Sequence, residues 1–420
     1  MEQFSALPFA VRLPAMFLLG TVVGAVVNWM SYRWAWHPRP ISPWMVPDPL
    51  APKRRWWDRL PVLGWLGLRR EAAVHGWGFW IRPMAVELVC GVGCAALYWW
   101  EVGSAGLLPD FLPPLSSQVL TVLHLQFAAH IILGALLLAA SLIDIDEKLI
   151  PDEITICGTL VGLLLAAACP WSLLPDVQYG DNGQVQLNFL QLASPCAWPD
   201  ILAGAPQLFS LAIALGCWWF WCLALLPRTW YDRHGWRRAM VLCWARMRCE
   251  PATYRLLRMA VVGSLAVLIV WLRNGEMWQG LLSSLMGVAV GGALIWSVRI
   301  IASAALGREA MGFGDVTLMA MIGAYLGWQS TLIIFFLAPL AGLAIGLIRL
   351  LLIRDREVPY GPFLCLATLF LIVAWEKIWN FTRDIFAIVW LVAAVMFVCL
   401  LLMAGMLSLW RMVLRIFRRF

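Results

Sequence analysis

Apolar residues dominate this chain in long runs, each bounded by charged residues, proline or glycine. A helix needs about 20 mainly apolar residues to cross a hydrocarbon core of about 30 Å. Eleven runs are candidates, so the pattern predicts an all-α polytopic membrane protein, a bundle of about 11 transmembrane helices. The predicted spans lie near residues 10–31, 83–100, 122–143, 153–170, 205–226, 256–272, 279–303, 315–328, 330–353, 361–379 and 385–410.

Basic residues are distributed unequally between the loops, and this predicts the side that each loop faces. Loop 32–82 carries nine Lys or Arg residues and loop 227–258 carries eight Arg, whereas loops 101–121 and 171–204 carry none. Loops rich in Lys and Arg stay in the cytoplasm. The alternation therefore predicts an N-terminus outside and a C-terminus in the cytoplasm.

Composition supports this class and excludes others. Hydrophobic residues make up 62% of the chain and charged residues only 13%, which is outside the range of soluble globular proteins. The net charge of +7 is explained by membrane orientation, so lipids rather than nucleic acid are the expected partners. The first run lacks a small-residue cleavage site, which argues against a removable signal peptide. Of the eleven cysteines only Cys196 is expected to face an oxidising compartment, so no disulfide framework is predicted.

Four regions are expected along the chain. The first two are a membrane region with a cytoplasmic loop at 1–170 and an inserted helix pair with an Arg-rich cytoplasmic loop at 171–275. The others are a second membrane region at 276–380 and an extra helix with a basic tail at 381–420. An Arg-rich loop most often provides orientation and attraction to anionic lipid, and less often a docking site for a partner.

Two acidic stretches are predicted at the cytoplasmic ends of spans, "SLIDIDEKLIPDEIT" at 141–155 and "MGFGD" at 311–315. Asp144 ends an apolar run, where a charge has a cost unless it is paired or functional. Asp315 follows two glycines, which we expect to permit positive φ and the close approach of another backbone. The second stretch thus predicts a helix start with room beside it.

Each acid also has a plain structural explanation: Asp144 as an interfacial helix end and Asp315 as a helix N-cap. Asp146 lies about 200° from Asp144 around a helix and so points elsewhere. Together, Asp144 and Asp315 indicate a dyad in which one acid is protonated and the other ionised, as amide hydrolysis requires. The sequence has no HExxH, CxxC or Gly-rich phosphate loop that would compete with this interpretation.

These stretches resemble the type IV prepilin peptidases, membrane aspartyl proteases of the GxGD type. The resemblance places the two catalytic aspartates on Asp144, the first acid of "IDID", and on Asp315, the last residue of "GFGD". Flanking similarities are "GTVVGAVVNWMSYR" with Asn28 and Arg33, "RPMAVELVCG" with Glu87, and "VPYGPFL" late in the chain.

The resemblance implies an aspartic-type endopeptidase of the bacterial inner membrane. Its substrates would be type IV prepilins or type II secretion pseudopilins, cleaved on the cytoplasmic side. It also implies N-methylation of the new N-terminus with S-adenosylmethionine. Loop 32–82 departs from the family, because it has no cysteine where two zinc-binding CxxC pairs are usual. No metal is therefore predicted, proteolysis needs no cofactor, and methylation stays open.

Two other classes are considered beside the peptidase. A proton-coupled transporter would place its acids near the middle of the bilayer and show internal repeats, and neither is found. An inactive scaffold of a secretion or pilus apparatus is disfavoured by the intact "GFGD" and Asp144. Glu87 is expected to reach the cytoplasmic interface and pair with Arg82 or Arg33.

Overall fold

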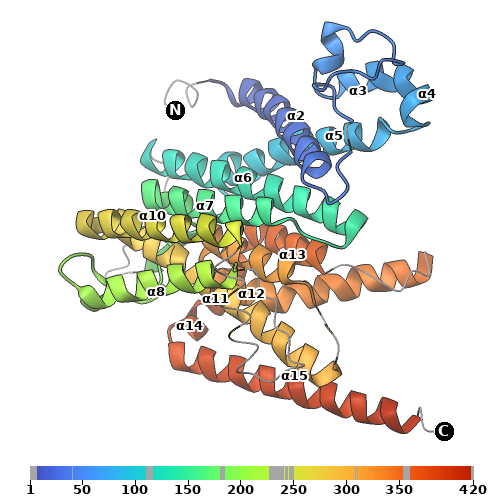
Figure 1. The fold of residues 1–420 in the computed structure, drawn as a ribbon. Coiled ribbons are helices and arrows are strands. Elements are labelled where there is room, and N and C mark those ends of the chain that lie inside the picture. Colours follow the sequence, from blue (N-terminus) through green and yellow to red (C-terminus); the bar gives the residue numbers. More distant parts are fainter. Residues whose placement is uncertain are drawn as a thin grey trace.

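Long helices packed into one bundle make up most of the chain (Figure 1). The computed structural model describes residues 7–39, 41–109, 117–179, 185–226, 241, 245, 250–307, 309, 311–352 and 360–417. Within these ranges, seven helices are long and apolar enough to cross a membrane, or eight if one bent pair counts as a single span. The predicted all-α membrane class is confirmed; the predicted count of eleven is not, and the sides of the termini stay a prediction.

The bounds of the helices follow the predicted apolar runs closely. The main helices are α2 (Phe9–Arg33), α5 (Ile81–Tyr98), α6 (Ser117–Glu147), α7 (Asp152–Ala168), α8 (Leu208–Ala224), α10 (Pro251–Arg273), α11 (Gly275–Leu306), α12 (Phe313–Leu352), α13 (Gly361–Val373), α14 (Trp375–Phe386) and α15 (Val389–Phe417). The count differs partly because α7 and α8 have only 17 residues each. It also differs because the predicted spans 315–328 and 330–353 are the two halves of α12, which are counted here as one helix.

Helix α12 nevertheless changes direction at Gly327, where φ is +80° and ψ 171°. A Cβ added to Gly291 of α11 would lie 2.8 Å from the Met319 carbonyl oxygen and 3.0 Å from Thr331 Cγ2. In a straight helix, Met319 and Thr331 would be about 18 Å apart. The two halves of α12 therefore fold back on each other beside α11, and only a residue without a Cβ reaches this φ without strain.

Small residues allow the helices to approach closely. Gly20 and Gly24 of α2 pack against the backbone of α5, and Gly158 and Gly162 of α7 pack against α12. In each case a Cβ would be too close to its neighbour. Membrane helices associate through such small-residue contacts because lipid provides no hydrophobic drive between them. The GxxxG spacings in the sequence thus mark real interfaces.

A β-hairpin that the sequence analysis did not predict lies between α7 and α8. Strands β1 (Pro175–Tyr179) and β2 (Val185–Phe189) pair antiparallel. The buried carboxylate of Asp176 accepts a hydrogen bond from Trp379 Nε1 of α14 at 2.9 Å. The hairpin thereby holds α14, which is bent by 94° from α13.

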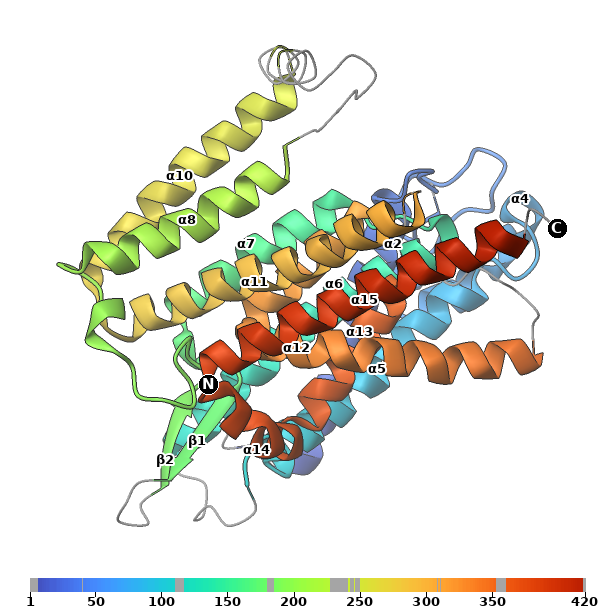
Figure 2. The same ribbon diagram turned by 90° about the horizontal axis from the view of Figure 1, so that it is seen from below.

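Helices α8 and α10 form an arm that diverges from the main bundle (Figure 2). The arm leaves the bundle at Gly204 and returns at Asn274, and these two residues touch: Gly204 N donates to Asn274 Oδ1 at 3.0 Å. Both helices lie within the region 171–275, which stays a predicted insertion. Most of its Arg-rich loop lies outside the described residues.

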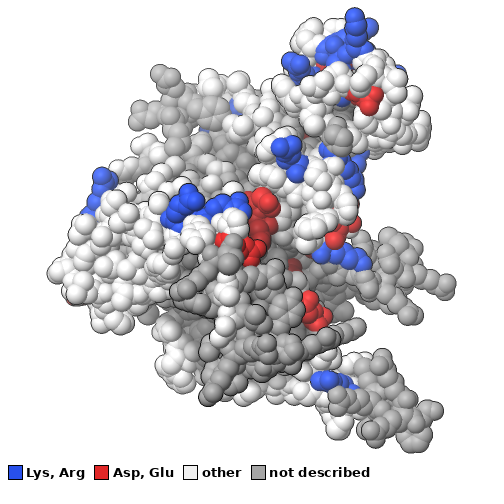
Figure 3. Space-filling view, viewed as in Figure 1, with Lys and Arg blue, Asp and Glu red and all other residues white. Residues whose placement is uncertain are grey.

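Between α2 and α5 the chain forms a small folded segment, residues 41–79, which includes α3 (Leu63–Leu68) and α4 (Ala72–His75). Its core holds Trp65 and Leu68, each 1% exposed. Two ion pairs hold the segment together: Arg54 is bidentate to Glu71 at 2.7 and 2.9 Å, and Arg70 contacts Asp58 at 2.6 Å. On the face shown in Figure 3, charged side chains gather over this segment and near the centre of the bundle.

Candidate active site

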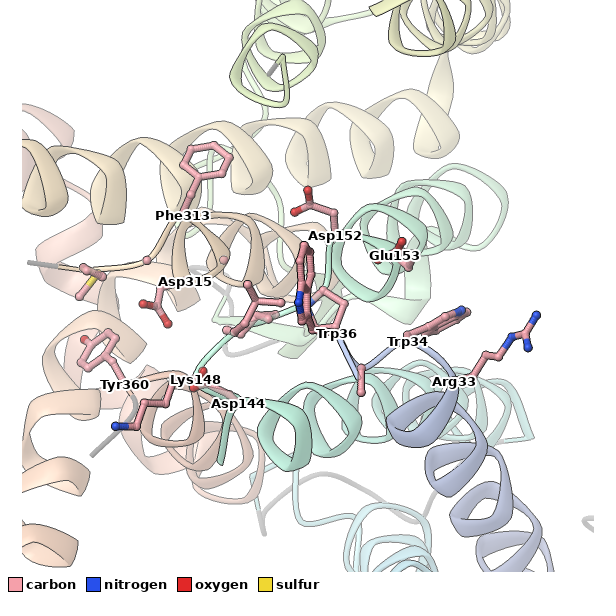
Figure 4. Close-up of a pocket in the computed structure, with 17 residues that line it drawn as sticks. Arg33, Trp34, Trp36, Asp144, Lys148, Asp152, Glu153, Phe313, Asp315 and Tyr360 are labelled. Atoms are coloured by element: carbon pink, nitrogen blue, oxygen red, sulfur yellow. The ribbon is translucent and has the colours of Figure 1, made fainter. Parts of the chain in front are cut away.

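Asp144 and Asp315 line the same cavity, although 171 positions separate them in the chain. The cavity has a volume of about 970 Å³ and opens at the end of the bundle where α6 ends and α12 begins. Figure 4 shows Asp315 with Tyr360 on one side of it, Asp144 with Lys148 on another, and Trp36 across from them. The structure thus brings together the two acids that the sequence analysis singled out.

Both carboxyl groups are largely shielded from solvent, with 6% of Asp144 and 7% of Asp315 exposed. Asp144 lies in the last turn of α6, and the backbone N–H of Gly361 interacts with its carboxylate. Its Oδ2 has no hydrogen-bond partner among the described residues. Asp315 lies in the first turn of α12, and the charge of Asp144 acts on it. A buried acceptor without a partner is costly, which is typical of a group that awaits a substrate or water.

The glycines of "GFGD" meet one part of the expectation and not the other. Neither Gly312 nor Gly314 has positive φ, so the expectation of positive φ is wrong, but Gly314 does allow another backbone to approach: an added Cβ would lie 3.3 Å from the carbonyl oxygen of Ile150. Gly314 also packs against the side chain of Ile150, whose Cβ would lie 2.8 Å from an added Cβ. This contact joins the start of α12 to the segment after Asp144. Gly312 has open space beside it, since no atom comes closer than 3.9 Å to an added Cβ.

The acids after Asp144 attach the end of α2 to the end of α6. Asp146 accepts two hydrogen bonds from Arg82, at 2.9 and 2.7 Å, and lies 3.7 Å from Arg39. The carboxylate of Glu147 accepts from the backbone N–H groups of Trp36 and His37 at 2.6 and 3.0 Å. As predicted, Asp146 does not line the cavity. The chain after α2 is therefore fixed at the rim of the cavity.

Glu87 does not pair with Arg82 or Arg33, so that expectation is wrong. It is 2% exposed and accepts from Trp65 Nε1 at 2.8 Å, from Asn28 Nδ2 at 3.3 Å and from the backbone N–H of Val62 at 2.5 Å. Three neutral donors stabilise this carboxylate in place of a cation. Glu87 thus joins segment 41–79 to α2 and α5.

Sequence reasoning missed Tyr360, Lys148 and the tryptophans at the cavity rim. Tyr360 directly precedes α13, and burial, together with the negative charge of Asp315, raises its pKa to about 12. Its phenol therefore remains neutral at physiological pH. The sequence signal was "VPYGPF", which the resemblance had already marked but to which no role was given.

No group of three or more His, Cys, Asp and Glu side chains converges to hold a metal ion in the part of the chain that the structure describes. Segment 41–79 has no cysteine, and its Asp58 and Glu71 are already paired with arginines. The zinc expected for this family therefore does not fit this segment. The cavity provides two carboxyl groups that have different partners and lie close enough for the charge of one to act on the other. Such a pair can supply one protonated acid and one ionised base.

The fold and cavity define a polytopic helical membrane protein with a carboxyl pair at one end of its bundle. Residues 252–347 match the type IV leader peptidase family. The matched residues include α11 and Asp315, and Asp144 lies outside the match. No solved structure matches.

Curated proteins named prepilin leader peptidase/N-methyltransferase are similar to parts of this chain. The prepilin leader peptidase/N-methyltransferase of Aeromonas hydrophila is 38% identical over 106 residues, 22% of this chain and 36% of that protein. The protein of that name from Pseudomonas aeruginosa is 31% identical over 147 residues, 33% of this chain and 50% of that protein. The chain thus spans about a third to a half of the length of these relatives. The one from Xanthomonas campestris is 22% identical over 390 residues, 87% of this chain and 91% of that protein.

Proposed function

We propose that the protein is an aspartyl endopeptidase that cleaves the leader peptide of type IV prepilins or type II secretion pseudopilins. The observation that carries the proposal is the shared cavity of Asp144 and Asp315, two acids from distant segments at one end of a membrane bundle. The family match and the names of the relatives supply the substrate class.

In this mechanism the dyad divides the work of amide hydrolysis. The ionised carboxylate removes a proton from a water molecule, whose oxygen attacks the scissile carbonyl carbon. The protonated acid donates its proton to the carbonyl oxygen. When the C–N bond breaks, the proton taken from water passes to the leaving amine, and the other aspartate takes back a hydroxyl proton from the tetrahedral intermediate, which leaves the carboxylic acid product and restores the pair. Like charges near one another favour this singly protonated state of the pair.

The position of the cavity suits a substrate that is part peptide and part membrane helix. The cavity opens at the end of the bundle, so a leader in water can enter while an apolar stem remains in lipid. Arg39 and Arg82 lie at the same end, through their contacts with Asp146. Because basic residues concentrate on the cytoplasmic side, they support a cytoplasmic cavity in a bacterial inner membrane protein.

The test is to incubate the purified protein in detergent with a prepilin-like peptide and S-adenosylmethionine, and to analyse the product by mass spectrometry. Asp144→Asn and Asp315→Asn are each expected to abolish cleavage while the protein still inserts. Asp384→Asn, which changes an acid whose side chain is 95% exposed, is the matched control and keeps activity. Cleavage retained in either cavity variant would refute the assignment.

The same experiment decides the second activity. A product with a methylated N-terminus, formed only with S-adenosylmethionine present, would establish methyl transfer in a chain whose segment 41–79 lacks the usual cysteines. The described residues assign no side chains to this cofactor, and proteolysis does not depend on it.

A further inference from the structure

One wall of the cavity that holds Asp144 and Asp315 is made by the chain that follows α2. Trp34, Ala35 and Trp36 line this wall. In Figure 4 the ring of Trp36 stands across the cavity from the two carboxyl groups. A peptide bound at the carboxyl pair would therefore have Trp36 on its opposite side.

The two tryptophans of this wall differ in their surroundings. The ring of Trp34 packs edge-on against Trp29 of α2, with the ring centroids 5.4 Å apart. Trp36 is 74% exposed, and its indole makes no ring contact or hydrogen bond with any residue that the structure describes. A single exposed apolar side chain is common and needs no explanation. An indole that faces two carboxyl groups across a cavity is different, because tryptophan is enriched among the residues that dominate binding.

The backbone of Trp36 is held by α6, the helix that carries Asp144. Glu147, three positions after Asp144, accepts from the backbone N–H of Trp36 at 2.6 Å through Oε2. Its Oε1 accepts from the backbone N–H of His37 at 3.0 Å. Hydrogen bonds to a carboxylate are about twice as strong as those between neutral groups. The indole is thus attached to the same helix as one of the two acids.

The rest of this wall is also fixed. The backbone N–H of Arg39 donates to the carbonyl oxygen of Tyr32 at 3.0 Å, which closes residues 32–39 into a loop. The guanidinium of Arg39 lies 3.7 Å from the carboxylate of Asp146 in α6. A wall held at both ends does not have to be ordered when a peptide enters, so less conformational entropy is lost on binding.

The chemistry of an indole favours an apolar or aromatic partner. Its face gains free energy when an apolar group covers it, and aromatic rings stack on it or meet it edge to face. Ile150 and Pro151 line the same cavity and add apolar surface. In the proposed function, the peptide at the carboxyl pair continues into an apolar stem. An apolar side chain therefore follows the scissile bond.

We propose that Trp36 is a substrate-binding residue against which the apolar side chain after the scissile bond packs, and that Glu147 is a positioning residue that holds Trp36 in place. This inference rests on the proposed peptidase function and adds to it the residue that selects the first side chain of the stem. Neither residue transfers a proton, so substrate binding and not the chemical step depends on them.

The first test measures kcat and KM for a prepilin-like peptide with the full-length protein in detergent. Trp36→Ala is expected to raise KM about tenfold and to change kcat less than about twofold. Trp36→Phe keeps an aromatic face and should restore most of the loss. Trp77→Ala is the matched control, because Trp77 is 94% exposed and does not line the cavity. Equal KM values for Trp36→Ala and Trp77→Ala would overturn the proposal.

A binding measurement separates this inference from the proposed function. The same peptide is bound to the Asp315→Asn variant with and without Trp36→Ala, and the affinity is expected to fall about tenfold with the second change. This measurement does not require cleavage. Peptide binding that depends on Trp36 in a protein that does not cleave would refute the peptidase and keep the binding role. Binding that is independent of Trp36 would overturn the binding role.

The positioning role of Glu147 is tested by a double-mutant cycle. Glu147→Ala should raise KM about as much as Trp36→Ala, and the double variant should raise it no further, because both changes remove the same contact. Glu147→Gln keeps one acceptor oxygen and should restore most of the loss. Effects that multiply in the double variant would overturn this role.

Peptide variants identify the side chain that Trp36 selects. Replacement of the apolar residue after the scissile bond by serine should raise KM about tenfold for the unmodified protein and less than about twofold for Trp36→Ala. Such a dependence on Trp36 at a basic residue of the leader, and not at the apolar residue, would contradict the assignment.

Discussion

At the scale of single residues, the carboxyl groups of Asp144 and Asp315 share a cavity, whereas that of Glu87 accepts hydrogen bonds from three donors on other segments. Asp144 and Asp315 were singled out because each interrupts an apolar context, and the structure places both at one cavity. The partners of Glu87 could not be predicted, because its donors lie up to 59 positions away and one is a backbone N–H. No local pattern encodes such contacts, whereas an acid in an apolar run is itself a local signal.

Glu87→Ala is expected to release segment 41–79 from the membrane bundle. It would leave the donors of Trp65, Asn28 and Val62 without their acceptor, which destabilises this docking by about 3 kcal/mol. Amide hydrogen exchange at residues 60–68 measures the effect as faster exchange. Glu276→Ala, which removes an exposed carboxylate bonded to Trp171 Nε1 at 3.0 Å, is the control. Unchanged exchange in Glu87→Ala would show that the segment is held by other contacts.

Gly361→Ala should move the carboxyl group of Asp144. An added Cβ would lie 2.5 Å from Asp144 Oδ2 and 3.0 Å from Ile150 Cδ1. Displacement of a reacting group by about 1 Å can lower a rate about 100-fold, so cleavage is expected to fall by that order while insertion is retained. Peptide cleavage assays measure it beside Gly216→Ala, where the added methyl group meets open space. Equal rates for the two variants would argue against Asp144 as a catalytic group.

At the scale of elements, helices were predictable and the small connecting structures were not. The length of an apolar run predicts the length of its helix, so the bounds of α2, α6 and α11 agree with the predicted spans within several residues. The strands β1 and β2 each have five residues and stand in a loop, although Val177, Tyr179, Val185 and Leu187 alternate with polar residues. That alternation is the signal that could have revealed them.

Segment 41–79 should depend on its ion pairs and not on metal. Glu71→Ala would leave the Arg54 guanidinium, only 13% exposed, without its carboxylate, and is expected to destabilise the segment by about 3 kcal/mol. Limited proteolysis of this segment measures the loss. The control is Glu309→Ala, which removes the ion-pair partner of Arg299. Because the Glu309 side chain is 86% exposed, this change should destabilise the protein by less than about 1 kcal/mol. Increased proteolysis of the unmodified protein after treatment with a metal chelator would contradict this prediction.

At the scale of the whole molecule, the two helices of the arm differ in how they meet the bundle: α8 packs on α11, with the rings of Phe220 and Trp296 5.8 Å apart, whereas α10 lies further out. Most of α10 is exposed, and its buried residues are Ala260, Val267 and Trp271. The arm begins and ends where Gly204 and Asn274 touch. Residues 171–275 were predicted to be an insertion because the chain is longer than the family that it resembles, and no chemical motif was found in them. Which residues of the arm would contact the bundle was not predictable, since this depends on where two distant loop ends meet.

Deletion of residues 205–273 is expected to leave a protein that inserts and cleaves. Gly204 would then be bonded directly to Asn274, which it already contacts, so the remaining helices need not move. Because Gly204 and Asn274 already lie in contact, joining them leaves the later helices on the side where they now lie. Peptide cleavage and protease accessibility of the C-terminus measure the two results. Loss of cleavage with correct insertion would show that the arm takes part in substrate binding.

The arginine–carboxylate construction of segment 41–79 also affects how the protein responds to stress. A thiolate site can be emptied when zinc is scarce, and its sulfurs can be converted to sulfenic or sulfinic acids by peroxide. The pairs Arg54–Glu71 and Arg70–Asp58 contain no atom open to either change. This part of the protein is therefore expected to keep its fold through metal starvation and oxidant exposure that would unfold a thiolate-bound counterpart.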